Sequence, residues 1–343
     1  MLIHPKSPII LNTYIMKITT LKTNPEFREK TLKLIEESFG YETPHSFAVD
    51  FYPLMAESNL ENCYLYIEDD RVLAHIAALP RVFTLNNESF PFIMYGGIAV
   101  AEDQRGKGLF TKLFNHILNK KQNYCFHLLW SDQVDLYKKF NFFPTGDLKS
   151  YPYKKSALPQ DIKIKNKKLI KCTDEELMQI KQLYESCNEL RIARDDQHWD
   201  EIAKIESSEV YLVTQGQQLI NYFIVGKGQD LQKTVHEYGQ INLSQLTLMQ
   251  NYGQVWSPYK CNKPQQQLLL TNMRIGSPKL FSHFMQQYAR IEVLSINKKE
   301  ISFEFKNSHY NFSKDEFLTG VFGPGRFKEL KLPYLNICGL DSI

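Results

Sequence analysis

The spacing of apolar residues changes sharply along the first half of the chain. Val72–Thr84 and Phe90–Val100 are apolar runs that contain β-branched and aromatic residues, which is typical of strands. The polar residues 86–88 between them predict a tight turn. After Arg105, apolar residues recur at helical spacing as far as Leu118, which predicts an amphipathic helix. The pattern therefore predicts a buried strand that passes through a short polar turn into a helix.

Shorter elements flank this unit. Strands are expected at Lys17–Lys22, Tyr64–Ile67 and Cys125–Trp130, and after Gly146; helices are expected at 27–39, His45–Glu57 and Asp132–Phe140. Gly40 and Asn141 stand at the ends of two of these helices, where a residue that tolerates the left-handed conformation is favoured. The order predicts an α/β (α+β) fold with a mixed, mainly antiparallel sheet flanked by helices.

The second half starts a similar order again. A helix is expected at Leu177–Leu190, and strands at Glu209–Thr214, Leu219–Val225 and Val235–Gly239. This order resembles that of 62–100, so we expect a structural repeat. Residues 153–168 are rich in lysine, contain Pro159 and lack apolar periodicity, which predicts a linker. The expected domains are therefore 16–152 and 169–343, joined by 153–168, with the end of the chain packed back on the body.

Composition narrows the function classes. The formal net charge of +3 gives no support for nucleic-acid binding. No apolar run approaches the length of a membrane span, and the first residues lack the features of a signal peptide, so a cytoplasmic protein is expected. None of the six cysteines lies at metal-ligand spacing, and we expect all of them to be reduced. His127 is expected to be a satisfied, half-buried histidine and not a metal ligand.

The polar turn Arg105-Gly106-Lys107-Gly108 carries the most informative chemistry. Its glycines allow unusual backbone dihedral angles and a close approach to a ligand. The helix that follows begins with unpaired N–H groups and the positive end of its macrodipole. Such a turn favours a phosphate group.

This strand, turn and helix resemble the acyl-CoA signature of the GNAT acetyltransferase superfamily, Gln/Arg-x-x-Gly-x-Gly/Ala. Phe110 departs from the small residue that the family usually has, and a bulky side chain is acceptable there if it points into the core. A second segment, 131–142, resembles the closing motif of the family, in which a tyrosine on a short helix precedes Lys-x-Gly-Phe. Here Tyr137 is that tyrosine and Asn141 replaces the glycine. The second half has no turn of this kind, and the resemblance implies a degenerate second GNAT-like domain.

The resemblance implies acetyl-CoA as co-substrate and no metal. The residues that it implies for binding acetyl-CoA are Ile98, Ala99, Val100, Arg105, Gly106, Lys107, Gly108, Leu109 and Phe110. The strand Ile98–Val100 would splay from Cys125–Trp130 and pair with the pantetheine amides, helped by a bulge at Gly96-Gly97. A main-chain N–H near Val100 would polarise the thioester, and Tyr137 would act as general acid toward the thiolate.

We expect an acetyl-CoA-dependent N-acetyltransferase that acts on an unidentified primary amine by direct transfer. The acceptor is a small molecule or a peptide, with no nucleic-acid or membrane partner, and the oligomeric state stays open. Four carboxylates are possible general bases, each more readily explained as a surface or paired acid: Glu36, Glu37, Glu57 and Glu237. The alternatives are a non-catalytic acyl-CoA-binding or regulatory protein and an aminoacyl transferase, a class that generally lacks the intact pyrophosphate turn.

Overall fold

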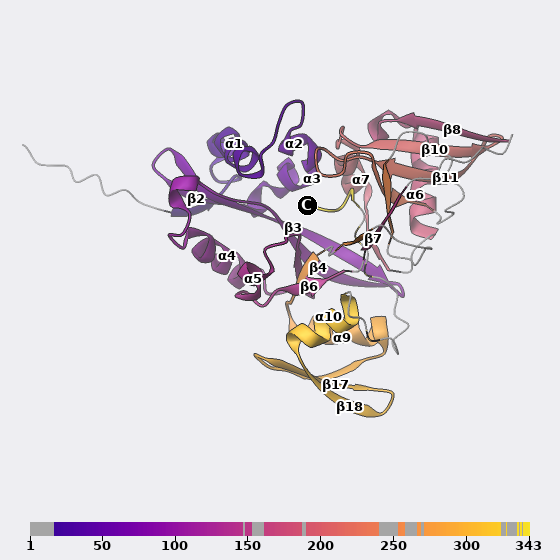
Figure 1. Ribbon diagram of the computed structural model, residues 1–343. Helices are drawn as coiled ribbons and strands as arrows, with labels where there is room; N and C mark the ends of the chain where they lie inside the picture. Colours follow the sequence, from indigo (N-terminus) through magenta and orange to yellow (C-terminus); the bar gives the residue numbers. More distant parts are fainter. Residues whose placement is uncertain are drawn as a thin grey trace, which may run out of the picture.

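Two large sheets and one small sheet make up the computed structural model (Figure 1). The structure describes residues 17–146, 148–152, 161–186, 190–239, 253–257, 266–268, 271–323, 327, 335, 337 and 339–343. The mixed architecture of antiparallel-dominated sheets flanked by helices confirms the predicted fold class. Among the described residues, no helix is long and apolar enough to cross a membrane.

The first half follows the predicted order closely. Its strands are β1 (Lys17–Thr20), β2 (Cys63–Glu68), β3 (Arg71–Leu85), β4 (Glu88–Val100), β5 (Phe126–Leu129), β6 (Phe143–Thr145) and β7 (Leu148–Pro152). Its helices are α1 (Arg28–Phe39), α2 (Phe47–Asp50), α3 (Tyr52–Met55), α4 (Leu109–Lys120) and α5 (Val134–Lys138). The single helix expected at 45–57 is two short helices, because Pro53 begins a new one at the first turn of α3. Gly40 and Asn141 have φ angles of 63° and 61°, as predicted.

The second half adds more strands than the sequence pattern indicated. Its strands are β8 (Ile162–Lys167), β9 (Arg191–Ile192), β10 (Glu209–Gln215), β11 (Gln218–Val225), β12 (Thr234–Tyr238), β13 (Gln254–Ser257), β14 (Gln266–Leu268), β15 (Thr271–Ile275), β16 (Glu292–Ile296), β17 (Glu300–Phe305) and β18 (Ser308–Ser313). Its helices are α6 (Asp174–Ser186), α7 (Asp196–Ala203), α9 (Pro278–Ala289) and α10 (Lys314–Phe322). The linker prediction is wrong for 162–167, which form β8 and pair with β10; here isoleucine alternates with lysine on an edge strand.

Each large sheet includes strands from the other half of the chain, namely β9, which pairs with β3, and β15 in the first sheet, and β7 in the second. The first runs β1-β2-β3-β4-β5-β15-β6, and the second runs β8-β10-β11-β12-β13-β7-β14. In both, antiparallel strands lead to one parallel pair, which is β4 with β5 in the first sheet and β12 with β13 in the second. The next strand, β15 or β7, comes from the other half of the chain. Each sheet therefore contains strands from both sides of the expected linker.

Apolar side chains cover both faces of the first sheet. Alternate residues of β3 and β4 point to opposite faces, as the pleat requires. Ala77 and Leu79 join a core with α1 and α9, while Ile76 and Ala78 join a second core with α4. In Figure 1, α1 and α4 lie on opposite sides of this sheet. The arrangement is a helix–sheet–helix sandwich that places α4 directly after β4.

The chain returns to the body at its end. Leu340 and Asp341 are each only 2% exposed, so the expectation of a tail packed on the body is confirmed for this segment. The tail lies between the two large sheets, close to α3 and α7 (Figure 1). Cys63, Cys125 and Cys172 carry free thiols, and the other three cysteines lie outside the described residues.

Candidate functional site

The first sheet opens between its two parallel strands. β4 pairs with β5 at Ile93, Met94 and Tyr95, and the pairing ends where Tyr95 faces Leu129. β4 continues to Val100 along β3, so its other edge has no paired strand beyond Tyr95 within the described part of the chain. Ile98, Ala99 and Val100 lie on this open stretch, as predicted. A strand edge with free N–H and C=O groups can bind an extended molecule as a further strand.

A β-bulge marks the opening. Gly97 and Ile98 of β4 face Ile76 alone on β3, because the register shifts between His75 and Ala77. Gly97 has a φ of 57°, which favours glycine, and this confirms the bulge expected at Gly96-Gly97. A Cβ atom there would lie 3.2 Å from atoms of His75 and of Phe47. The close packing leaves no room for a larger residue without a shift of these side chains.

His75 holds this bulge from below, which the sequence did not indicate. Its Nδ1 lies 2.7 Å from the Gly97 carbonyl oxygen and must donate, since a carbonyl only accepts. The ring is fully buried, and burial lowers its pKa to about 4 against the opposing effect of the Gly97 hydrogen bond. His75 is therefore neutral near pH 7 with its proton on Nδ1. Recognising this role requires the strand register, which the sequence pattern alone does not fix.

The glycine turn lies at the end of the open strand. Gly106 and Gly108 have φ angles of 76° and 78°, and a Cβ atom on either would meet nothing within 4 Å. Gly108 is the N-cap of α4 and its carbonyl accepts the first helical bond, from Lys112. The N–H groups of the residues just before Lys112 therefore have no acceptor within the helix. The turn is exposed and suited to an anion.

The predicted cationic side chains do not close over the turn. Arg105 donates from Nε to the Val100 carbonyl at 3.3 Å, and Lys107 lies 3.3 Å from the Gln104 side chain. Both side chains are exposed. They add positive charge around the turn, while the geometric preference for an anion comes from the main chain.

Tyr137 lies on α5 against α4. It is 6% exposed, and its ring packs edge-on against Phe110 at 5.9 Å and Phe114 at 6.4 Å. Burial raises its pKa to about 12, partly offset by a hydrogen bond with Ser131, two residues beyond β5. The phenol therefore keeps its proton over the physiological pH range. Phe110 stands where the GNAT signature usually has a small residue. Its side chain is half-buried in the same aromatic cluster, which accommodates its size.

Three of the four candidate general bases have a polar partner in the structure, and the fourth is exposed. Glu36 accepts from the Phe47 N–H at 2.9 Å, Glu37 pairs with Lys33 at 3.8 Å, and Glu57 is exposed. Glu237 is buried and receives two hydrogen bonds from Arg194, at 2.9 and 2.6 Å. These hydrogen bonds and ion pairs account for Glu36, Glu37 and Glu237 without a catalytic role.

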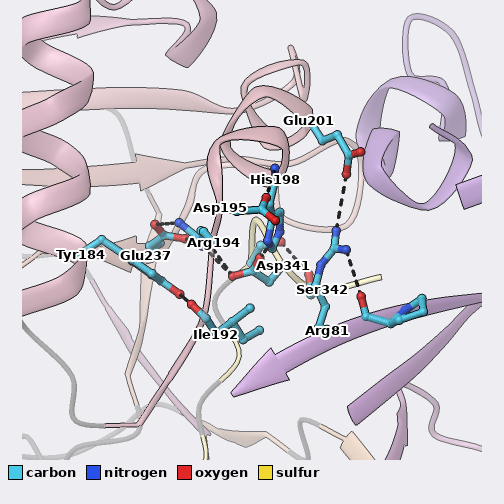
Figure 2. Close-up of polar contacts among 12 residues, drawn as sticks. Arg81, Tyr184, Ile192, Arg194, Asp195, His198, Glu201, Glu237, Asp341 and Ser342 are labelled. Carbon is cyan, nitrogen blue, oxygen red and sulfur yellow. Dashed lines mark hydrogen bonds and ion pairs between the residues drawn. The ribbon is translucent and has the colours of Figure 1, made fainter. Parts of the chain in front are cut away.

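Arg194 is the centre of a buried ionic network, shown in Figure 2. It also donates to Asp341 at 3.1 and 2.6 Å, and its guanidinium lies 4.0 Å from the Tyr184 ring centroid and 4.8 Å from that of Trp199. Burial alone would lower the Arg194 pKa, but the two carboxylates outweigh it and raise the pKa. The network joins β12 to the tail and so fixes the tail between the sheets.

His127 behaves as a structural histidine. It is 2% exposed, and its Nδ1 lies 2.8 Å from the Tyr95 hydroxyl. Burial, and to a smaller extent the charge of Arg274, lowers its pKa to about 3. The expectation of a satisfied histidine is confirmed, but the side chain is fully buried and not half-buried as expected. Within the described residues, no group of three or more histidine, cysteine or acidic side chains is placed to hold a metal ion.

The parted strands, the bulge and the glycine turn at a helix start together define an extended-ligand site with an anion cradle at one end. Residues 21–144 match the family model of the acetyltransferase (GNAT) domain. The first half of the chain is therefore similar to a GNAT acetyltransferase domain. No protein with a curated description matches the sequence significantly.

Solved structures share this fold across most of the chain. Eis1 from Mycobacterium abscessus matches with a TM-score of 0.60 and 12% identity, over 89% of this chain and 90% of that one. A probable N-acyltransferase from Enterococcus faecalis matches with 0.59 and 12%, over 87% and 85%. A GCN5-related N-acetyltransferase from Anabaena variabilis matches with 0.59 and 13%, over 87% and 85%. At these identities the comparison establishes the fold of both halves, and not the substrate.

Proposed function

We propose that this protein is an acetyl-CoA-dependent N-acetyltransferase that transfers the acetyl group directly to a primary amine. The opening between β4 and β5 carries this proposal, because it leads straight into the glycine turn at the start of α4. Within the turn 105–110, the pyrophosphate would bind the main-chain N–H groups of 106 and 108–110, because those of Arg105 and Lys107 donate to the Glu102 and Gln104 carbonyl oxygens. The pantetheine arm would pair with Ile98–Val100, which places the thioester near the bulge.

Tyr137 is the proposed general acid. Attack by a neutral amine on the thioester carbonyl forms a tetrahedral oxyanion, which a main-chain N–H of β4 would stabilise. Collapse breaks the C–S bond and releases a thiolate, and the Tyr137 hydroxyl donates a proton to it. The proton that the amine nitrogen loses passes through water and restores the Tyr137 phenol. A raised phenol pKa keeps this proton available, and the thiolate in the same dry surroundings is also more basic than in water.

The second half is proposed to be a degenerate copy of the same fold. The support is the matching order of strands, with one parallel pair in each sheet followed by a strand from the other half of the chain. This half has no counterpart of the Arg105–Gly108 turn in its sequence. Its proposed role is to complete the acceptor side of the site, with the boundary between the domains placed between 152 and 162, because β8 belongs to the second sheet.

A thermal-shift series with CoA, acetyl-CoA and longer acyl-CoAs tests the donor site. A ligand that binds the folded state raises its stability by about 2.7 kcal/mol at one hundred times its Kd, so a clear rise in Tm is expected. Absence of a shift with every CoA species would remove the proposal.

Tyr137→Phe tests the chemistry. We expect kcat to fall by about a hundredfold or more while the affinity for CoA is kept, since the lost group acts on the leaving thiolate. Tyr66→Phe is the matched control, because Tyr66 is a buried tyrosine of the same core on β2, away from the opening. A loss of CoA affinity in Tyr137→Phe would make Tyr137 a packing residue.

The second candidate is a non-catalytic acyl-CoA-binding protein. The same donor site supports it, and three of the four candidate general bases, Glu36, Glu37 and Glu237, already have partners. Thiol release with an amine panel separates the two: CoA binding without acyl transfer to any amine would favour the binding protein. An aminoacyl transferase is less well supported, since the pyrophosphate turn is intact.

A further inference from the structure

The opening in the first sheet is closed at its far end. A pantetheine arm that leaves the glycine turn and pairs with Ile98–Val100 would run back along β4 and bring the acyl group to Gly96. In line with the arm, the pairing of Tyr95 with Leu129 joins the two strands again. An acyl chain longer than acetyl would therefore have to leave the opening through one face of the sheet.

The face toward α4 is filled by the core of the first half. Tyr95 belongs to this core, is 1% exposed, and packs edge-on against the Phe114 ring of α4 at 5.1 Å. Leu129 belongs to the same core and is fully buried. Because protein interiors are close-packed, these side chains cannot admit several methylene groups without a large loss of stability. This face therefore offers no path for a longer chain.

The face toward α1 is closed by one side chain of α3 and one of the tail. A Cβ atom on Gly96 would lie 3.1 Å from Leu54 Cδ2 and from Ile343 Cβ, so both side chains lie directly against the strand. Leu54 is fully buried in the core that contains α1, whereas Ile343 is half-buried. Of these two walls, Ile343 is the one that the core does not enclose.

A cavity lies behind Ile343. Its volume is about 160 Å³, and it is lined by Ile343 and by Trp130, the residue that follows Leu129 on β5. Among the described residues that line it, none belongs to β4, so Ile343 separates the cavity from Gly96. Five further apolar side chains line the cavity: Phe51, Leu148, Leu231, Trp256 and Ile337.

Two buried cations of the second half hold the tail in this position. Arg194 donates to the Asp341 carboxylate, as Figure 2 shows. Lys227 donates from Nζ to carbonyl oxygens on both sides of Asp341, those of Gly339 at 2.8 Å and Ser342 at 2.5 Å. Release of the tail would leave these buried charges without their partners, which is costly. The isoleucine that follows Ser342 is therefore fixed against the strand.

We propose that Ile343 restricts the acyl group of the donor to a short chain, because it closes the opening at Gly96 against the cavity behind it. The inference rests on the proposed function for the direction of the pantetheine arm and the position of the thioester. An acetyl group ends at the bulge, whereas a hexanoyl chain would overlap Ile343. With a smaller side chain at this position the cavity would accept the extra carbon atoms, since an apolar cavity of about 150 Å³ holds benzene.

Calorimetric titration of the full chain with CoA, acetyl-CoA and hexanoyl-CoA tests this inference without an acceptor. In the unchanged chain we expect acetyl-CoA to bind about tenfold more tightly than hexanoyl-CoA, because a longer chain overpacks a filled site. Ile343→Ala should raise the affinity for hexanoyl-CoA about tenfold and leave that for acetyl-CoA unchanged. Ile343→Val keeps a branched side chain on the tail and should give a smaller gain, of about two- to threefold.

Ile337→Ala is the matched control, because Ile337 lines the same cavity while the atoms nearest Gly96 belong to Leu54 and Ile343. It enlarges the cavity without opening it toward β4, so its affinity for hexanoyl-CoA should equal that of the unchanged chain. Equal binding of acetyl-CoA and hexanoyl-CoA by the unchanged chain, no gain in Ile343→Ala, or an equal gain in Ile337→Ala would overturn the inference and leave the donor site standing. Absence of binding by every CoA species would instead contradict the proposed function, and with it the premise of this inference.

Discussion

His75 shows how one side chain can set the geometry of a site that it does not enter. Its Nδ1 proton fixes the Gly97 carbonyl, and because the peptide is planar and trans, the Ile98 N–H points the opposite way. The backbone of β4 at the opening is therefore oriented by a ring beneath the sheet. His75 is a positioning residue in the proposed reaction.

We predict that His75→Phe lowers kcat about tenfold and destabilises the fold by about 1–3 kcal/mol, since it leaves the buried Gly97 carbonyl unpaired. His75→Asn restores a donor near the same place and should recover kcat in larger part than stability. Steady-state kinetics and urea unfolding measure the two effects. Equal losses of kcat in the two variants would indicate that the ring acts through packing alone.

At the scale of elements, the turn between β4 and α4 combines two left-handed glycines with a helix start. The open space around Gly106 and Gly108 means that a methyl group would clash with no protein atom. A methyl group would lower the stability of the fold, because the left-handed backbone is strained for any residue with a Cβ atom. It would also weaken anion binding, because it would occupy space on the turn. The effects on stability and on anion binding can be separated, because the chain has another glycine with a left-handed backbone away from this turn.

Gly108→Ala should reduce stability by about 1 kcal/mol and weaken CoA binding by at least tenfold, because the methyl group enters the proposed phosphate cradle. Gly216→Ala is the matched control: Gly216 has a φ of 61°, also in open space, in the turn between β10 and β11. It should show the same stability loss and unchanged CoA affinity. Calorimetric titration with CoA and urea unfolding compare the pair, and equal CoA affinities would argue against phosphate binding at this turn.

At the scale of the whole molecule, the exchanged strands make each half depend on the other. β15 lies between β5 and β6, and its Asn272 side chain donates to the Ser131 carbonyl at 2.8 Å. Without β15 the first sheet would be interrupted beside β5 and expose the edges of β5 and β6. The second sheet depends on β7 in the same way.

Residues 1–160 expressed alone should therefore fail to fold cooperatively, while co-expression with 161–343 should restore a folded complex. Urea unfolding followed by circular dichroism measures cooperativity, and size exclusion reports the complex. The intact chain is the control and should unfold in one transition. A cooperative transition of the 1–160 fragment by itself would show that β15 is dispensable for the first sheet.

The sequence by itself determined the local elements of the site: the strand into Val100, the left-handed glycines and the amphipathic α4. These follow from apolar periodicity and from the conformational freedom of glycine, which act between near neighbours in the chain. It also indicated the bulge at Gly97 and the fold class that these elements build. The catalytic role of Tyr137 comes from the family resemblance and stays a prediction. In the second half, the sequence pattern missed β8 and the small sheet of β16–β18. Most residues of these strands are half-buried or exposed, so they carry no clear run of apolar residues.

Only the tertiary structure decided which strands pair. The alternation of apolar and polar residues indicates which face of a sheet each side chain lies on, but not which strand lies beside it. The sequence pattern therefore could not predict that β7 and β15 lie in the sheet of the other half. The same reason hid the hydrogen bond of His75 to the Gly97 carbonyl and the ion pair of Glu237 with Arg194. Each of these depends on segments far apart in the chain that pack together, and long-range packing is set by the whole molecule.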